Sequence, residues 1–310
     1  MAITGSCCSI HLKGPASMRG LITPLLLLLS LPLAAETVMP KPILRTLDTG
    51  GPALRYAIHE PATAATNRPL VVLIHGWSCD ASYWEAQLPA LRSRYRVITL
   101  DLAGHGGSAA DRNDWSMRAF GEDVRRVVDA VDPQSPLLLV GHSMGGPVAI
   151  EAARQLGQRV RAVIGVDTFS TVGLPRPPAA ETAARIAFFE RDFAGTTRMF
   201  VTRTFFRPDA DPALRERIAA DMAAGDPRVG IAAVQGLNDW DGVPAMAELP
   251  VPIIAINADL APTDAERIRR SVPRFELVVM ARSGHFLMME DPARFNPLLL
   301  EQLERFVTDR

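Results

Sequence analysis

The chain has 310 residues, of which 48% are hydrophobic and 22% are charged, and its formal net charge is −1. This apolar content excludes an intrinsically disordered chain, and the near-neutral charge excludes a strongly basic protein that holds nucleic acid. The length is enough for one large globular domain or at most two small ones.

The N-terminus has the pattern of a secretory signal peptide. Residues 21–33 (LITPLLLLLSLPL) are almost purely apolar, Arg19 precedes them, and Ala34 and Ala35 follow. A basic start, a short apolar run and small residues at its end are typical of such signals. The run is shorter than the ~20 residues that a membrane-spanning helix needs.

We therefore expect residues 1–35 to be a leader and residues 36–310 to form the mature protein. This predicts export, to a periplasm or to the medium, and no stable membrane span after processing. An uncleaved membrane anchor and a buried first helix are the alternatives. Met18 competes with Met1 as the true start, because the segment that begins at Met18 is a complete signal by itself.

Short aliphatic runs alternate with helical patterns along the mature chain. Each run is bounded by Gly, Asp, Pro or Ser, as expected for strands that are buried on both faces. A leading hairpin is predicted from 43–47 and 54–59, with Gly50-Gly51-Pro52 as its turn. The buried runs are 70–74, 95–100, 137–140, 160–166, 252–256 and 275–280.

Helices are predicted over 116–131, with Ser116 as N-cap, over 144–157 and over 292–307. Strand–helix alternation of this kind predicts an α/β fold, with a mostly parallel central sheet and helices on both faces. The stretch from about 170 to 248 interrupts the alternation with several short helical segments. We interpret it as an inserted helical lid over a pocket, and the alternative is a plain helical excursion of the domain.

The most informative stretch is Leu137–Gly146, in which Gly141-His142-Ser143-Met144-Gly145 joins a predicted strand to a predicted helix. A sharp turn of this type exposes the Ser143 hydroxyl and requires small residues on either side. The backbone N–H of Met144 then faces any negative charge that develops on a bound carbonyl oxygen.

Over roughly residues 40–308 the chain resembles the α/β-hydrolase superfamily. The G-x-S-x-G turn carries this resemblance, together with motifs that follow three other strands: His75-Gly76-Trp77, Asp101–Ser108 and Ser283-Gly284-His285-Phe286, the last followed by Met289–Pro292. The resemblance implies Ser143 as nucleophile and His285 as general base. It also implies an oxyanion hole from the N–H groups of Trp77 and Met144. We assign His75, Gly76, His142 and Phe286 to the substrate-binding surface.

Two carboxylates compete for the acid that orients the base. Asp259 follows a strand where most of the superfamily carries its acid, although it lacks the usual Gly and its Pro262 comes three residues later. Asp167 ends a strand 24 residues after Ser143, where haloalkane dehalogenases place theirs. Both stay candidates, with Asp259 favoured by the commoner pattern.

The resemblance implies a serine hydrolase that cleaves carboxylic esters with an apolar acyl group, a small-molecule substrate, through an acyl-enzyme. A C–C bond hydrolase, a lactonase or another acyl hydrolase would use the same residues. A protein that only binds a small ligand is the alternative of another class, because such relatives can retain the triad. Neither a metal-ligand pattern nor a nucleotide-binding motif is found, so no cofactor is expected.

Overall fold

The computed structural model describes residues 41–62 and 68–307, together with residues 2, 9, 11, 12 and 14. The chain divides into two units, Met1–Thr37 and Val38–Arg310, and the fold is that of the second unit. The predicted signal peptide, residues 1–35, lies outside the described residues except at those five positions, and it stays a prediction. Within the described ranges, no helix has the length and apolar character needed to cross a membrane.

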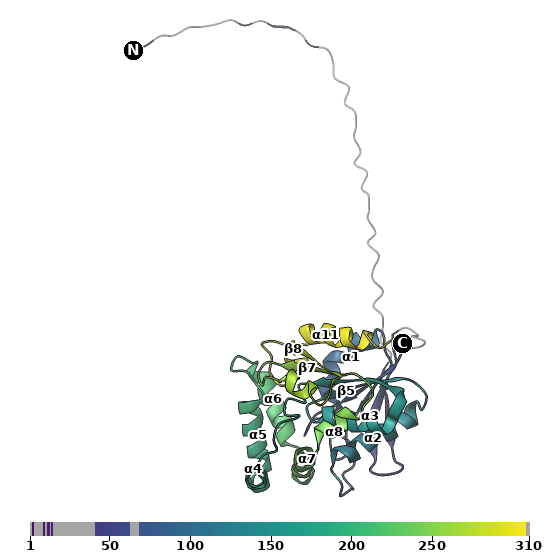
Figure 1. Cartoon of the computed structure of the whole chain (residues 1–310). Coiled ribbons are helices and arrows are strands. Elements are labelled where there is room, and N and C mark those ends of the chain that lie inside the picture. Colours follow the sequence, from purple (N-terminus) through teal and green to yellow (C-terminus); the bar gives the residue numbers. More distant parts are fainter. Residues whose placement is uncertain are drawn as a thin grey trace. The chain divides into compact units, whose positions relative to one another are not determined.

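An eight-stranded sheet with strand order β1-β2-β4-β3-β5-β6-β7-β8 forms the centre of this unit (Figure 1). β1 and β2 form the predicted antiparallel hairpin, β2 is antiparallel to β4, and the remaining neighbours are parallel. The strands are β1 (Ile43–Leu47), β2 (Leu54–His59), β3 (Leu70–Ile74), β4 (Val97–Leu100), β5 (Leu137–His142), β6 (Val160–Val166), β7 (Ile253–Ala258) and β8 (Phe275–Met280).

The parallel strands are aliphatic because helices cover both faces of the sheet. Every residue of β3, β5 and β7 is buried. In Figure 1, α1 (Leu88–Arg92) and α11 (Pro292–Glu304) lie on one face, and α2 (Met117–Val131) and α3 (Gly145–Leu156) lie on the other, with α8 (Gly242–Ala247) beside α3. The predicted α/β fold is therefore confirmed.

The predicted helix starts and strand runs match the structure to within a few residues. The Ser116 hydroxyl accepts a hydrogen bond from the Ala119 N–H at 3.2 Å, which makes it the N-cap of α2. Strand β4 begins at Val97 and not at residue 95, and β5 continues to His142. The pattern did not predict α1 or the other short helices, which are η1 (Ala81–Gln87), η2 (Gly157–Arg159), α9 (Ala265–Arg269) and α10 (Leu287–Glu290).

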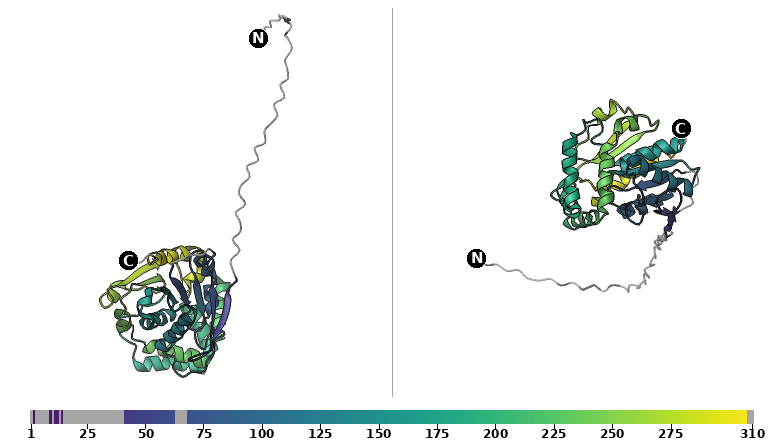
Figure 2. Two further views of the ribbon diagram at one scale, coloured as in Figure 1. Left: turned by 90° about the vertical axis from the view of Figure 1, so that its right-hand side faces the viewer. Right: turned by 90° about the horizontal axis from the view of Figure 1, so that it is seen from below.

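The insertion between β6 and β7 consists of helices, as predicted. They are α4 (Ala179–Arg191), α5 (Phe193–Thr204), α6 (Pro212–Ala223) and α7 (Pro227–Asp239), followed by α8. In Figure 2 the helices α4–α7, in green, gather at one side of the sheet. Because the insertion starts at the carboxyl end of β6, it begins at the edge of the sheet where open α/β folds bind ligands.

The close packing of α2 on α3 makes a testable prediction about stability. A Cβ added to Gly121 in α2 would lie 2.7 Å from the backbone nitrogen of Ala152 in α3, so Gly121→Ala forces the helices apart. We expect a loss of about 1–3 kcal/mol in the free energy of unfolding, which lowers Tm by about 2–4 °C for each kcal/mol.

Thermal unfolding of the two forms measures this loss. The matched control is Ala130→Ser at an exposed position of the same helix, which we expect to leave Tm nearly unchanged. An unchanged Tm for Gly121→Ala would contradict the close approach of the two helices.

Candidate functional site

The turn between β5 and α3 lies at the point where the order of the strands in the sheet reverses. The chain passes from β3 to β4 on one side and then to β5 on the other, so the loops after β3 and β5 part at this point. Ligands of open α/β sheets bind at such switch points, beyond the carboxyl ends of the strands. Ser143 follows β5 and Trp77 follows β3, which places both at this edge.

Ser143 has the strained backbone that the turn requires. Its φ is 52°, in the left-handed region that a non-glycine residue seldom adopts. The conformation is held by the Ser143 N–H, which donates to Val166 O at 2.9 Å, and by Ser143 O, which accepts from Gly146 N and from the Thr168 hydroxyl. Strain that is fixed in this way is typical of a functional position.

The two glycines of the turn are required by close contacts. A Cβ at Gly141 would lie 2.0 Å from Gly145 O, and a Cβ at Gly145 would lie 2.5 Å from Ile74 O. Gly76 is equally constrained, since its Cβ would lie 3.0 Å from the His142 ring and 3.3 Å from Ser143 Cβ. Gly76 therefore lies directly against Ser143, and its assignment to the substrate-binding surface stays a prediction.

His285 contacts the same turn from the loop after β8. Its carbonyl accepts a hydrogen bond from His142 Nε2 at 2.9 Å, and the two imidazole rings have centroids 4.7 Å apart. His285 thus lies against the residue that precedes Ser143. Within the described part of the chain the Ser143 hydroxyl, which is partly exposed, has no hydrogen-bond partner.

The carboxylate beside the His285 ring is that of Asp167. Asp167 Oδ2 accepts from His285 Nδ1 at 2.6 Å, and Asp167 Oδ1 accepts from the Ala258 N–H at 2.8 Å. Because an ionised carboxylate only accepts, Nδ1 is the donor in this contact. The side chains of His285 and Asp167 are 13% and 15% exposed, so this charge-assisted contact is shielded from water.

Asp259 has other partners, which corrects the preference for it that the sequence pattern gave. Its Oδ1 accepts from the Arg282 N–H at 2.8 Å and lies 3.5 Å from Arg207 Nη1 of the insertion. The Arg282 N–H, first among several contacts, lowers the pKa of the Asp259 carboxyl. The structure brings Asp167, and not Asp259, to the imidazole.

Asp167 is held in place by its neighbour on β7. Its φ is 44°, also left-handed. The Asn257 side chain accepts from Thr168 N at 3.1 Å and donates to Thr168 O at 2.8 Å, which fixes the turn that follows Asp167. No sequence motif singled out Asn257, although it lies two residues before the competing Asp259.

Two backbone N–H groups beside the Ser143 turn are free to donate to a ligand. Within the described residues, neither the Met144 N–H nor the Trp77 N–H donates to another group. Met144 is the N-cap residue of α3, so the positive end of the helix dipole adds to its N–H. These are the groups that the sequence predicted to face an oxyanion.

Three residues predicted to bind substrate are packed against protein instead. The His75 side chain is completely buried, with Nδ1 donating to Gly76 O at 2.8 Å and Nε2 accepting from Leu102 N at 2.9 Å. Phe286 is also completely buried, and His142 is 1% exposed. All three support the loops of the site and offer no exposed surface to a ligand, which corrects their assignment.

Aromatic side chains of the insertion cover the site. The Phe205 ring is stacked on the His285 imidazole, with centroids 4.1 Å apart and planes 23° apart. The Trp77 ring meets Phe189 and Phe193 edge-on, and its Nε1–H donates to Gly230 O of α7 at 2.8 Å. The sequence does not predict the contact of Phe205 with His285, because nothing local in the sequence shows that Phe205 reaches the imidazole.

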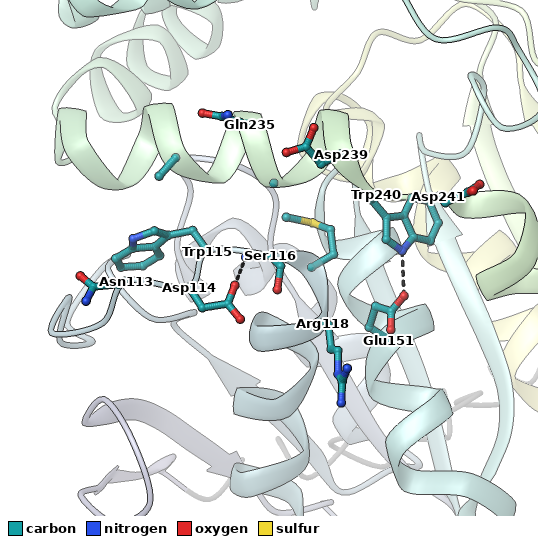
Figure 3. Close-up of a pocket in the computed structure, with 13 residues that line it drawn as sticks. Asn113, Asp114, Trp115, Ser116, Arg118, Glu151, Gln235, Asp239, Trp240 and Asp241 are labelled. Carbon is teal, nitrogen blue, oxygen red and sulfur yellow. Dashed lines mark hydrogen bonds between the residues drawn. The ribbon is translucent and has the colours of Figure 1, made fainter.

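A separate groove of about 450 Å³ lies between α7 and the loop before α2 (Figure 3). Trp240 Nε1 donates to Glu151 across it at 2.9 Å, and Asp114 Oδ1 accepts from the Ser116 N–H. Neither Ser143 nor His285 lines this groove, so it is not part of the candidate site. Among the described residues, no cluster of His, Cys, Asp and Glu could hold a metal ion.

Comparisons with known proteins identify the family and the fold. A model of the alpha/beta hydrolase family matches residues 71–298. The chain is 31% identical to a pimeloyl-(acyl-carrier protein) methyl ester esterase of Methylococcus capsulatus, over 61% of this chain and 74% of the relative. It is 25% identical to 3-oxoadipate enol-lactonase 2 of Acinetobacter baylyi, over 84% and 97%. The crystal structure of a hydrolase from Pseudomonas aeruginosa superposes with a TM-score of 0.71 at 26% identity, over 84% of this chain and 98% of that chain.

The stacking of Phe205 on the imidazole predicts how His285 reacts with a small electrophile. Phe205→Ala uncovers one face of the ring, so diethyl pyrocarbonate should modify His285 several-fold faster than in the wild type. Peptide mass spectrometry identifies the modified histidine. The matched control is Phe188→Ala, on α4 and 54% exposed, which should leave the rate unchanged. Equal rates in all three proteins would refute the shielding role of Phe205.

Proposed function

Because the chain belongs to the alpha/beta hydrolase family, we propose that it is a serine hydrolase that cleaves carboxylic esters through Ser143, His285 and Asp167. The observation that carries this proposal is the 2.6 Å contact between Asp167 Oδ2 and His285 Nδ1, beside a serine on a strained strand-to-helix turn. A carboxylate at that nitrogen fixes the tautomer in which Nε2 accepts a proton.

The proposed reaction uses the groups in a defined order. Ser143 Oγ attacks the ester carbonyl carbon while its proton passes to His285 Nε2, and the Asp167 carboxylate stabilises the imidazolium. The N–H groups of Met144 and Trp77 stabilise the oxyanion. The imidazolium then protonates the departing alcohol. A water activated by His285 hydrolyses the acyl-enzyme and restores Ser143.

The missing hydrogen bond between Ser143 and His285 is compatible with this scheme. Hydrogen bonds between catalytic groups are often long in ligand-free proteins and tighten only when substrate is bound. His285 is anchored to the turn that carries Ser143 through the hydrogen bond from His142 Nε2 to His285 O.

We propose a substrate with an apolar acyl group. The half-buried ring of Phe205 stacks on the His285 imidazole, and an aromatic surface of this kind favours apolar ligand groups. A lactone is an internal ester, so the same residues would open it, and one relative is named an enol-lactonase. Lactone hydrolysis is therefore the second candidate.

Single substitutions distinguish the proposed roles. We expect Ser143→Ala to abolish hydrolysis of p-nitrophenyl esters and labelling by a fluorophosphonate. Asp167→Asn should lower kcat by about 10³–10⁴-fold, because the imidazole then loses its tautomer and its counter-charge. Asp259→Asn, the matched control, should change kcat less than tenfold. Loss of activity in Asp259→Asn with a near-normal Asp167→Asn would overturn the assignment of the acid.

A series of p-nitrophenyl esters with acyl chains of increasing length tests the substrate class in the same assay. Turnover that rises from acetate to medium-chain esters supports the apolar pocket. Labelling and turnover of a γ-lactone, without turnover of linear esters, would favour the lactonase. A folded wild type that is neither labelled nor active would favour a ligand-binding protein.

We also propose that the protein is exported after removal of residues 1–35, on the sequence pattern alone. The extracellular or periplasmic fraction of an expressing bacterium should then contain a chain that begins near Glu36, as measured by intact mass and N-terminal peptides. A chain that keeps residues 21–33 and sediments with membranes would indicate an anchor instead.

A further inference from the structure

One carboxylate bridges the backbone on both sides of His285. Glu290, the last residue of α10, accepts from the Gly284 N–H through Oε2 at 3.0 Å and from the Phe286 N–H through Oε1 at 3.1 Å. A Cβ at Gly284 would lie 2.6 Å from Glu290 Oε1, so only glycine lets the carboxylate come this close. These two hydrogen bonds tie Glu290 to the residues on either side of His285.

The backbone groups of His285 itself are bound by two other parts of the protein. The His285 N–H donates to Phe205 O of the insertion at 2.8 Å, and His285 O accepts from His142 Nε2 of the turn at 2.9 Å. With Glu290, three consecutive N–H groups and one carbonyl are fixed. The backbone on both sides of the His285 side chain is therefore restrained by hydrogen bonds.

Partial burial of an ionised carboxylate such as that of Glu290 costs free energy unless hydrogen-bond donors are paired with it. Burial is the main cause that raises the pKa of Glu290, while the Gly284 and Phe286 N–H groups act in the opposite direction. These N–H groups are the donors that stabilise the carboxylate in this position. The arrangement is therefore specific to a side chain that accepts two hydrogen bonds and donates none.

We propose that Glu290 is a positioning residue for His285, which holds the imidazole in line with Asp167 through the flanking amides. This inference rests on the proposed role of His285 as general base. Glu290 would then affect the reaction of Ser143, His285 and Asp167 without itself touching the substrate.

Glu290→Gln is the direct test. The amide has the same shape as the carboxylate, but one of the two accepting oxygens is replaced by an NH₂ group, which only donates. This NH₂ group faces a backbone N–H, so the loop must shift. A misplacement of about 1 Å costs on the order of 10²-fold in rate. We expect kcat for a p-nitrophenyl ester to fall by that order with KM within about twofold, since Glu290 does not touch the substrate. Glu290→Asp keeps two acceptor oxygens and should recover part of kcat.

A spectroscopic readout separates positioning from folding. The proton between His285 Nδ1 and Asp167 Oδ2 is in a 2.6 Å hydrogen bond, which gives a far-downfield ¹H NMR resonance. Glu290→Gln should shift or broaden it, and Glu290→Asp should restore it in part. The matched control is Asp291→Ala, which removes the N-cap acceptor of Arg294 N in α11 and should lower Tm without changing kcat or the resonance.

The outcomes decide between the alternatives. A wild-type kcat and resonance in Glu290→Gln would overturn the proposal, as would a loss of kcat that only parallels a loss of Tm. If Glu290→Gln does not fold, the same comparison is made with Glu290→Asp, whose resonance must move if Glu290 positions the ring. If the wild type lacks esterase activity, the proposed function fails, while the resonance still tests the positioning of His285.

Discussion

The close approach of backbone segments at the turn after β5 is the constraint on which the rest of the site depends. Gly141 and Gly145 leave no space for a Cβ, so α3 begins directly at the end of the strand and Ser143 takes a left-handed conformation. The same edge of the sheet carries the ends of β3, β6, β7 and β8. Residues that lie far apart in the sequence therefore converge here because of the parallel topology, without any direct signal that links them.

The half-buried carboxylates in this region accept hydrogen bonds chiefly from backbone amides. Asp167 uses one oxygen for the Ala258 N–H and the other for His285, and both Glu290 oxygens accept from backbone N–H groups. Amides in a fixed backbone need no reorganisation when charge moves during a reaction, which is the main advantage of a preorganised site. The strands and the loops that follow them thus supply rigidity as well as position.

The sequence predicted the strands, the turn and the position of His285 because each depends on local patterns. It left the choice between Asp167 and Asp259 open, since both follow parallel strands at the same edge. That choice is made by side-chain direction, and Asp259 is turned towards Arg282 and towards Arg207 of the insertion. The contact of Phe205 with His285 likewise depends on how the insertion packs, and its residues carry no periodic signal for this.

Phe205 also limits how the insertion can change during evolution. It belongs to the insertion that we propose shapes the ligand surface, and its carbonyl accepts from the His285 N–H while its ring stacks on the imidazole. Replacements in α4 or α6 can alter which molecules enter without touching the base. A change in the direction of the chain at Phe205 would alter both the proposed ligand surface and the contacts that hold His285. New specificities in this lineage should therefore arise in the helices on either side of Phe205, while the segment itself stays constant in shape.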